Sequence, residues 1–263
     1  HLSYKIVDAA TGACPQSVDL FGNTGSLIGA DGTLQDDFVL SRVSINKKKT
    51  MTEVPQLVDL TTADSITSVD GKVLTQLIVS GFARLNAKVD VLNHINVFPI
   101  ADNDTGANMK ICLKLPTRNL LLEPSDSARI VASNMAADVL LNGQGNSGTI
   151  LSHFFISLAE ELATVEDECA LSIDAFARCL ARTGTKMNDA VSNPMEGTIV
   201  SVARDGCCVD DRSYASLRAL LDAWMLKCSE ALARTPDQLI VDGVKVLEKA
   251  GVVDSGAQGF VYI

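Results

Sequence analysis

The sequence has few of the residues that build the commonest catalytic and structural sites. Its 263 residues include one tryptophan and three histidines. The seven cysteines are odd in number and form no C-x-x-C pair, so we expect reduced, buried thiols rather than a disulfide framework or a zinc site. Lys and Arg number 22 against 32 Asp and Glu, a net charge of −10. This balance argues against non-specific binding to nucleic acid and against docking on anionic membranes.

Several motifs are also missing. No G-x-x-x-x-G-K-[ST] loop is present, which excludes a P-loop enzyme, and the protein-kinase signatures are missing as well. No apolar run approaches the length of a membrane span. We therefore expect a cytoplasmic protein without a membrane span. The chain begins with His1 and ends within an apolar run, which predicts a fragment, so organellar targeting by a preceding segment is not excluded.

Two closely spaced acids stand at the centre of the sequence. The run NVFPIADNDTGANM, residues 96–109, places Asp102 and Asp104 directly before an expected helix that starts at Thr105. Mg²⁺ binds in proteins through one or two carboxylates together with phosphate oxygens. The N–H groups of Thr105 to Asn108 would then face the same phosphates. The alternative is that Asp104 caps the helix and Asp102 is a solvated turn residue, and spacing alone leaves both interpretations open.

The remaining pattern predicts an all-α protein. Apolar residues recur with helical spacing from Val73 to Leu92, and a glycine-rich turn at 143–148 allows a ligand to approach the backbone closely. We expect helices at 105–115, ended by Pro116, at 125–141, capped by Ser125 or Asp126, and at 149–162, 171–190, 197–208, 213–233 and 236–250. These would form an antiparallel bundle over residues 66–263. Residues 1–65, with short β-prone pieces at 38–40 and 43–45, are expected to form an irregular or β-prone extension whose role no motif indicates.

Five collinear motifs give the sequence a family resemblance. Residues 96–109 resemble the signature of the catalytic subunit of fatty acid kinases, which belong with the dihydroxyacetone kinase L-subunits. DGK at 70–72, GNSGTILS at 145–152, NPMEGTIVSVARD at 193–205 and AGVVDSGAQGF at 250–260 match the same family in the same order. The resemblance covers residues 66–263 and implies a barrel of about eight antiparallel helices with a nucleotide at one open end.

The resemblance also implies a site. ATP would bind with Mg²⁺, as two ions, held by the catalytic residues Asp102 and Asp104. Asn96 matches a third metal ligand of the family, although it could instead be a turn-forming asparagine. The residues matched to the nucleotide site are Thr105, Gly106, Asn108, Met109, Gly145, Asn146, Ser147, Gly148, Thr198, Asp254, Ser255 and Gly256. Taken singly, Ser147 or Thr198 could be helix caps and Asp254 a turn residue.

The implied activity is Mg²⁺-dependent phosphoryl transfer from ATP, releasing ADP, to an acceptor held by a separate protein. For the fatty acid kinases the acceptor is the carboxylate of a fatty acid on a DegV-type protein, and the product is an acyl-phosphate. A glycerone (dihydroxyacetone) kinase L-type subunit working with a dihydroxyacetone-binding subunit is the alternative. A non-catalytic nucleotide-binding regulatory module is a third hypothesis, because Gln144 stands where the family commonly has arginine. Ala101, Asn103 and Ala257 also depart from the family pattern. A homodimer is one option for assembly.

Overall fold

The computed structural model describes residues 4–5, 17–18 and 60–263. The chain divides into two compact units, His1–Thr52 and Glu53–Ile263. In the smaller unit, β1 (Tyr4–Lys5) pairs antiparallel with β2 (Ser17–Val18). The expected β-prone pieces at 38–40 and 43–45 lie outside the described residues.

The larger unit is built from helices, which confirms the all-α prediction. In order these are α1 (Gly71–Asn86), α2 (Val89–His94), α3 (Thr105–Leu122), α4 (Ala128–Asn142), α5 (Gly145–Leu162), α6 (Ile173–Ala190), α7 (Ile199–Gly206), α8 (Leu217–Gln238), α9 (Val246–Ala250) and α10 (Ser255–Tyr262). Within residues 60–263, eight of them have eight or more residues. None of the described helices combines the length and the apolar character needed to cross a membrane.

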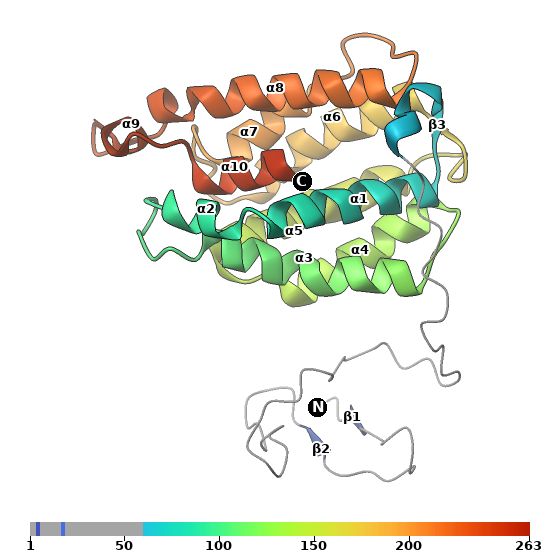
Figure 1. The fold of residues 1–263 in the computed structure, drawn as a ribbon, viewed down its shortest axis with the longest axis horizontal. Helices are drawn as coiled ribbons and strands as arrows, with labels where there is room; N and C mark the ends of the chain where they lie inside the picture. The colour runs from blue at the N-terminus through green and yellow to red at the C-terminus, as the bar shows by residue number, and fades with distance from the viewer. Residues whose placement is uncertain (1–3, 6–16, 19–59) are drawn as a thin grey trace. The chain divides into compact units, whose positions relative to one another are not determined.

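Short elements connect the helices. A 3-10 helix, η1 (Leu60–Ser65), precedes β3 (Ser68–Val69), which pairs antiparallel with β4 (Leu171–Ser172) in front of α6. A hairpin of β5 (Ile240–Val241) and β6 (Val244–Lys245) joins α8 to α9. Figure 1 shows the two short helices α2 and α9 at the same end of the bundle.

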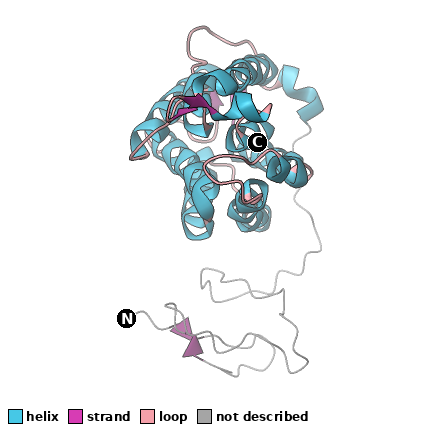
Figure 2. Ribbon diagram, turned by 90° about the vertical axis from the view of Figure 1, so that its left-hand side faces the viewer, coloured by secondary structure: helices cyan, strands magenta, loops and turns pink. Residues whose placement is uncertain are grey.

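The long helices form a closed bundle around one apolar core. From α3 to α8 each helix packs against the next, and α10 then contacts α7, α8, α3 and α1. Figure 2 shows the bundle from the end where α2 and α9 lie. The ring of Phe154 on α5 meets the ring of Phe260 on α10 edge to face, with 5.0 Å between their centroids. Aromatic pairs of this geometry contribute beyond their buried area, so this contact joins α10 to the centre of the bundle.

Pro116, which was expected to end a helix, lies inside one, and so does Pro236. Pro116 is buried within α3, which continues to Leu122, and Pro236 lies within the last turn of α8. A proline inside a helix removes one backbone hydrogen bond at a cost of about 3 kcal/mol. Leu113 and Leu120, on either side of Pro116, are almost fully buried. Their burial favours continuing the helix past the proline.

Other predicted boundaries are also corrected. The apolar stripe expected to form one helix from Val73 to Leu92 is split between α1 and α2. The cap of α4 is Ser127, whose hydroxyl oxygen accepts from the N–H of Ile130, and not Ser125 or Asp126. The prediction of one helix at 236–250 is wrong, because those residues form the end of α8, the hairpin and the five-residue α9.

The close contact between α6 and α7 leads to a stability prediction. A Cβ atom on Gly184 of α6 would lie 2.8 Å from the Cβ of Cys207 and 2.9 Å from the carbonyl oxygen of Ala203. Gly184→Ala should therefore lower the free energy of unfolding by about 1–3 kcal/mol, because the two helices must separate slightly. Urea denaturation measures this change, with Thr185→Ala on the exposed face of α6 as the control. Equal stability of Gly184→Ala and wild type would contradict the packing described here.

Candidate functional site

The N-terminal ends of four helices meet around one cavity of about 480 Å³. The start of α3 contributes Thr105, the start of α5 contributes Gly145, and α7 and α10 follow Thr198 and Asp254. Each helix N-terminus carries a partial positive charge from its unpaired N–H groups. A helix start favours an anion only where its first N–H groups are not already taken by a capping side chain.

Most of the residues predicted for the site line this cavity. Those that do are Asn96, Asp102, Asp104, Thr105, Asn108, Gly145, Asn146, Ser147, Thr198, Asp254 and Gly256. Gly106, Met109, Gly148 and Ser255 do not line it. The Met109 side chain is fully buried, and a Cβ on Gly259 would lie 2.4 Å from its sulfur, so Met109 packs under α10.

The two acids of the loop between α2 and α3 are exposed and differ in their contacts. The Asp102 carboxylate accepts a hydrogen bond of 2.8 Å from the side-chain amide of Asn96. Asp104 occupies the N-cap position of α3, but its side chain makes no capping hydrogen bond. The interpretation of Asp104 as the helix cap is therefore wrong. Among the described residues, no group of three or more His, Cys, Asp or Glu is placed to hold a metal.

Asn93 of α2 caps α3 in place of Asp104. Its Oδ1 atom accepts from the N–H of Gly106 at 2.8 Å and from the N–H of Ala107 at 3.2 Å. The N–H of Asn108 donates to the carbonyl oxygen of Asp104. The expectation that these three N–H groups of α3 face a phosphate is consequently wrong. Sequence analysis missed Asn93 because its partners lie thirteen and fourteen residues away.

The start of α5 has no such cap. The glycine-rich segment at 145–148 is the first turn of this helix and not a loop before it, and Gln144 at the N-cap makes no side-chain capping bond. Gly145 has a φ of 61°, and a Cβ there would lie 2.4 Å from the Asn108 amide nitrogen. The first N–H groups of a helix have no partner within it. Gly145, Asn146 and Ser147 therefore present the best N–H groups for an anion in this cavity.

Asp254 joins the starts of α7 and α10. Its Oδ2 atom accepts from the N–H of Ile199 at 3.1 Å and from the N–H of Ala257 at 2.8 Å. Burial raises the pKa of Asp254 to about 6, although these two N–H groups favour the charged form and oppose the shift. Thr198 stands at the N-cap of α7, where it forms a capping box with Ser201, and its hydroxyl donates to the carbonyl oxygen of Met195. Asp254 is thus a helix cap and not simply a turn residue.

The charge of the cavity lining is entirely negative. Among the described residues that form it, three are aspartates and none is lysine, arginine or histidine. A phosphate chain here would have only backbone N–H groups, polar side chains and any bound cation to offset its charge. The lining also contains the apolar side chains of Phe98, Ile150, Val191 and Met195, which sequence analysis did not single out.

Comparison with known proteins shows to which family this chain belongs. Residues 99–263 match the model of the DAK2 domain. The chain belongs to the DAK2-domain family. This DAK2 domain is related to the dihydroxyacetone kinase L-subunits, as the motifs around Asp102 and Asp254 had indicated.

Full-length relatives of this DAK2 domain are longer proteins. It is 31% identical over 202 residues to "Protein YloV" of Bacillus subtilis, an alignment that covers 76% of this chain and 35% of the relative. An "Uncharacterized protein" of Staphylococcus epidermidis is 30% identical over 201 residues, with 75% and 35% covered. The chain thus spans about a third of the length of these relatives.

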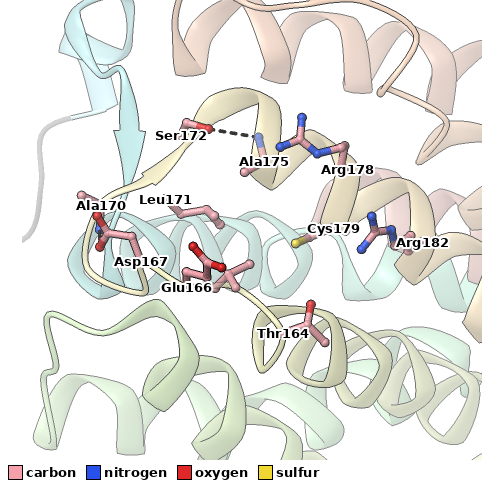
Figure 3. A pocket seen from close by; sticks show the side chains of 11 residues that line it. Thr164, Glu166, Asp167, Ala170, Leu171, Ser172, Ala175, Arg178, Cys179 and Arg182 are labelled. Carbon is pink, nitrogen blue, oxygen red and sulfur yellow. Dashed lines mark hydrogen bonds between the residues drawn. The ribbon is translucent and has the colours of Figure 1, made fainter.

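The DAK2 domain has a second cavity, of about 440 Å³, beyond the other end of α5 (Figure 3). It is lined by the segment that follows α5 and by the first turns of α6, with Glu166, Asp167, Arg178 and Arg182 as its charged residues. The 18 residues of α5 separate the two cavities by roughly 27 Å. None of the predicted site residues lines this second cavity, so the candidate site is the one at the helix N-termini.

Proposed function

We propose that the domain binds ATP with Mg²⁺ and transfers the terminal phosphoryl group to an acceptor carried by a separate protein. The observation that carries this proposal is one cavity that unites the starts of α3, α5, α7 and α10 with Asp102 and Asp104, and whose described lining residues include no cationic side chain. Phosphoryl transfer needs in-line positioning and neutralisation of the phosphate oxygens. In a lining of this charge, a divalent cation is the natural source of that neutralisation.

Each part of the cavity has a role in this proposal. Asp102 and Asp104 would hold Mg²⁺, predicted as two ions, with Asn96 as a third oxygen donor. The metal would supply the positive charge that neutralises the phosphate oxygens. The first turn of α5, at 145–147, would receive the phosphates through its N–H groups. The apolar lining residues Phe98, Ile150, Val191 and Met195 would contact the base.

The acceptor is proposed to come from a partner. The described residues that line the cavity include no histidine, cysteine or lysine that could serve as a nucleophile or carry a covalently bound ketone. The motifs at 96–99 and 252–259 favour the fatty acid kinase branch. The proposed acceptor is therefore a fatty acid carboxylate on a DegV-type protein, and the product an acyl-phosphate. Glycerone kinase activity with a dihydroxyacetone-binding subunit is the alternative.

Turnover assays distinguish these acceptors. The full-length protein would be incubated with ATP, Mg²⁺ and either a fatty acid on a DegV-type protein or dihydroxyacetone on its binding subunit. We expect ATP consumption and acyl-phosphate formation only in the first mixture. Turnover only in the second would assign the protein to the glycerone kinase branch.

A regulatory nucleotide-binding module is the second candidate. It is motivated by Gln144, which stands at the start of α5 where the family commonly has arginine. Tight binding of Mg-ADP by the full-length protein, with no phosphoryl transfer to either partner-bound acceptor, would support this candidate over the kinase.

A further inference from the structure

Asn93 lies on α2, the short helix directly before the loop that carries Asp102 and Asp104. Its amide oxygen accepts from two successive N–H groups of α3, those of Gly106 and Ala107. A Cβ on Gly106 would lie 2.5 Å from the carbonyl oxygen of Val89. The start of α3 can therefore lie this close to α2 only with glycine at position 106.

Asn96 holds the middle of the same loop. It is only 3% exposed, and its amide nitrogen donates to the Asp102 carboxylate at 2.8 Å and to the carbonyl oxygen of Ile100 at 2.9 Å. Both of these partners can only accept, which fixes the orientation of the amide. The amide oxygen then accepts from the hydroxyl of Thr105. Asn96 thus connects Asp102 to the first residue of α3.

The helix that carries Asn93 is itself anchored. Leu92 is fully buried in the core, and its carbonyl oxygen accepts from the hydroxyl of Ser255 at 2.7 Å. Ser255 begins α10 and follows Asp254, the residue that joins α7 and α10. The loop of the two acids is therefore tied to a helix fixed to both the core and the opposite side of the cavity.

We propose that Asn93 is a positioning residue that fixes the start of α3, and with it the loop that carries Asp102 and Asp104, before Mg²⁺ binds. The proposal rests on the proposed function, because it assumes that these acids are the metal ligands. Asn93 acts through the backbone of Gly106 and Ala107 and not on the acids directly. Removing a residue that orders a metal site from outside its ligands commonly lowers metal affinity by about ten- to a hundredfold. A loop ordered in advance also binds without the entropy cost of ordering it at that moment.

Asn93 gives the cleaner test because it does not line the cavity. Asn93→Ala should weaken Mg²⁺-dependent ADP binding about tenfold or more, measured by calorimetry. In the metal-free protein the amide hydrogens of Gly106 and Ala107 should exchange faster. Asn93→Asp keeps an oxygen acceptor at the start of α3 and should restore affinity to within about threefold of wild type. If Asn93→Ala does not fold, Asn93→Ser can replace it, because serine keeps a shorter acceptor. Its affinity for Mg-ADP should lie between that of wild type and the roughly tenfold weaker value expected for Asn93→Ala.

Asn119 provides a matched control on the same helix. Its amide nitrogen donates to the Asp138 carboxylate at 2.8 Å, far along α3 from Thr105. Asn119→Ala should leave Mg²⁺ affinity unchanged while losing a comparable hydrogen bond. Wild type that binds Mg-ADP, together with Asn93→Ala that binds it equally well, would overturn the positioning role. Wild type without any Mg²⁺-dependent nucleotide binding would instead overturn the proposed function. In that case the exchange rates of Gly106 and Ala107 still decide whether Asn93 orders the loop.

Discussion

Replacing Asp104 with asparagine should abolish Mg²⁺-dependent nucleotide binding, with affinity reduced by more than about a hundredfold. Mg²⁺ is held by few protein ligands and demands near-octahedral geometry, so losing one carboxylate of two disables the site. Folding should hardly change, because the Asp104 side chain is exposed and makes no capping bond. Metal-free stability could even rise slightly, since two nearby like charges no longer repel. Asp102→Asn should likewise abolish Mg²⁺-dependent binding. It should also leave the fold unchanged, because its side-chain oxygen can still accept from Asn96.

Calorimetric titration of Mg-ATP and thermal unfolding of the metal-free protein would measure the two effects separately. Asp90→Asn is the control, since Asp90 is an exposed acid in the first turn of α2 and its loss changes the net charge equally. Unchanged Mg-ATP affinity in both Asp102→Asn and Asp104→Asn would contradict the metal site and with it the kinase proposal.

The largest effect on stability is expected at Asp254. Asp254→Ala should lower the free energy of unfolding by about 2–5 kcal/mol, because the N–H groups of Ile199 and Ala257 lose their acceptor in a buried position. Asp254→Asn supplies an oxygen of the same reach and should retain most of the stability. Urea denaturation at neutral pH would measure both variants. Equal losses in Asp254→Ala and Asp254→Asn would show that the negative charge, and not the acceptor, is what the two helices need.

The raised pKa of Asp254 also predicts a pH dependence. Its value of about 6 in the folded protein compares with an ordinary value of 3.8. Between about pH 4 and pH 6 the folded state therefore keeps a proton that the unfolded state has released, so this group's contribution to stability falls as pH rises through that window. The free-energy difference between wild type and Asp254→Asn should shift in favour of the variant by on the order of 2 kcal/mol from pH 4 to pH 7. A difference that is constant with pH would contradict the shift.

Local patterns in the sequence predicted most of the helices but few of their ends. The all-α class and the helix at 171–190 followed from apolar spacing, and α6 covers Ile173–Ala190. The hairpin of β5 and β6 also had a local signal that was not used, since Asp242-Gly243 is a two-residue turn with positive φ at both residues. The burial that carries α3 past Pro116 depends on distant helices and has no local signal.

The candidate site divides in the same way. The motifs around Asp102, Asn146, Thr198 and Asp254 indicated the residues that line the cavity, and the structure brings all four together. Which helix start remains open to a ligand could not be predicted, because it depends on side chains from other parts of the chain. Asn93 caps the start of α3, and Asp254 caps the starts of α7 and α10, whereas no side chain among the described residues caps α5. Such assignments require the folded arrangement.

The positions of the cysteines allow thiol modification to report on motion between helices. Cys169 and Cys208 are exposed, whereas Cys112 is buried between α3 and α5, with its sulfur 3.3 Å from the hydroxyl of Ser152 and 3.5 Å from the carbonyl oxygen of Gly148. Burial raises the pKa of Cys112 as well, so a thiolate-seeking reagent reaches it only when the two helices separate. With the exposed cysteines replaced, the rate at which Cys112 is alkylated would therefore measure how often α3 and α5 separate around it.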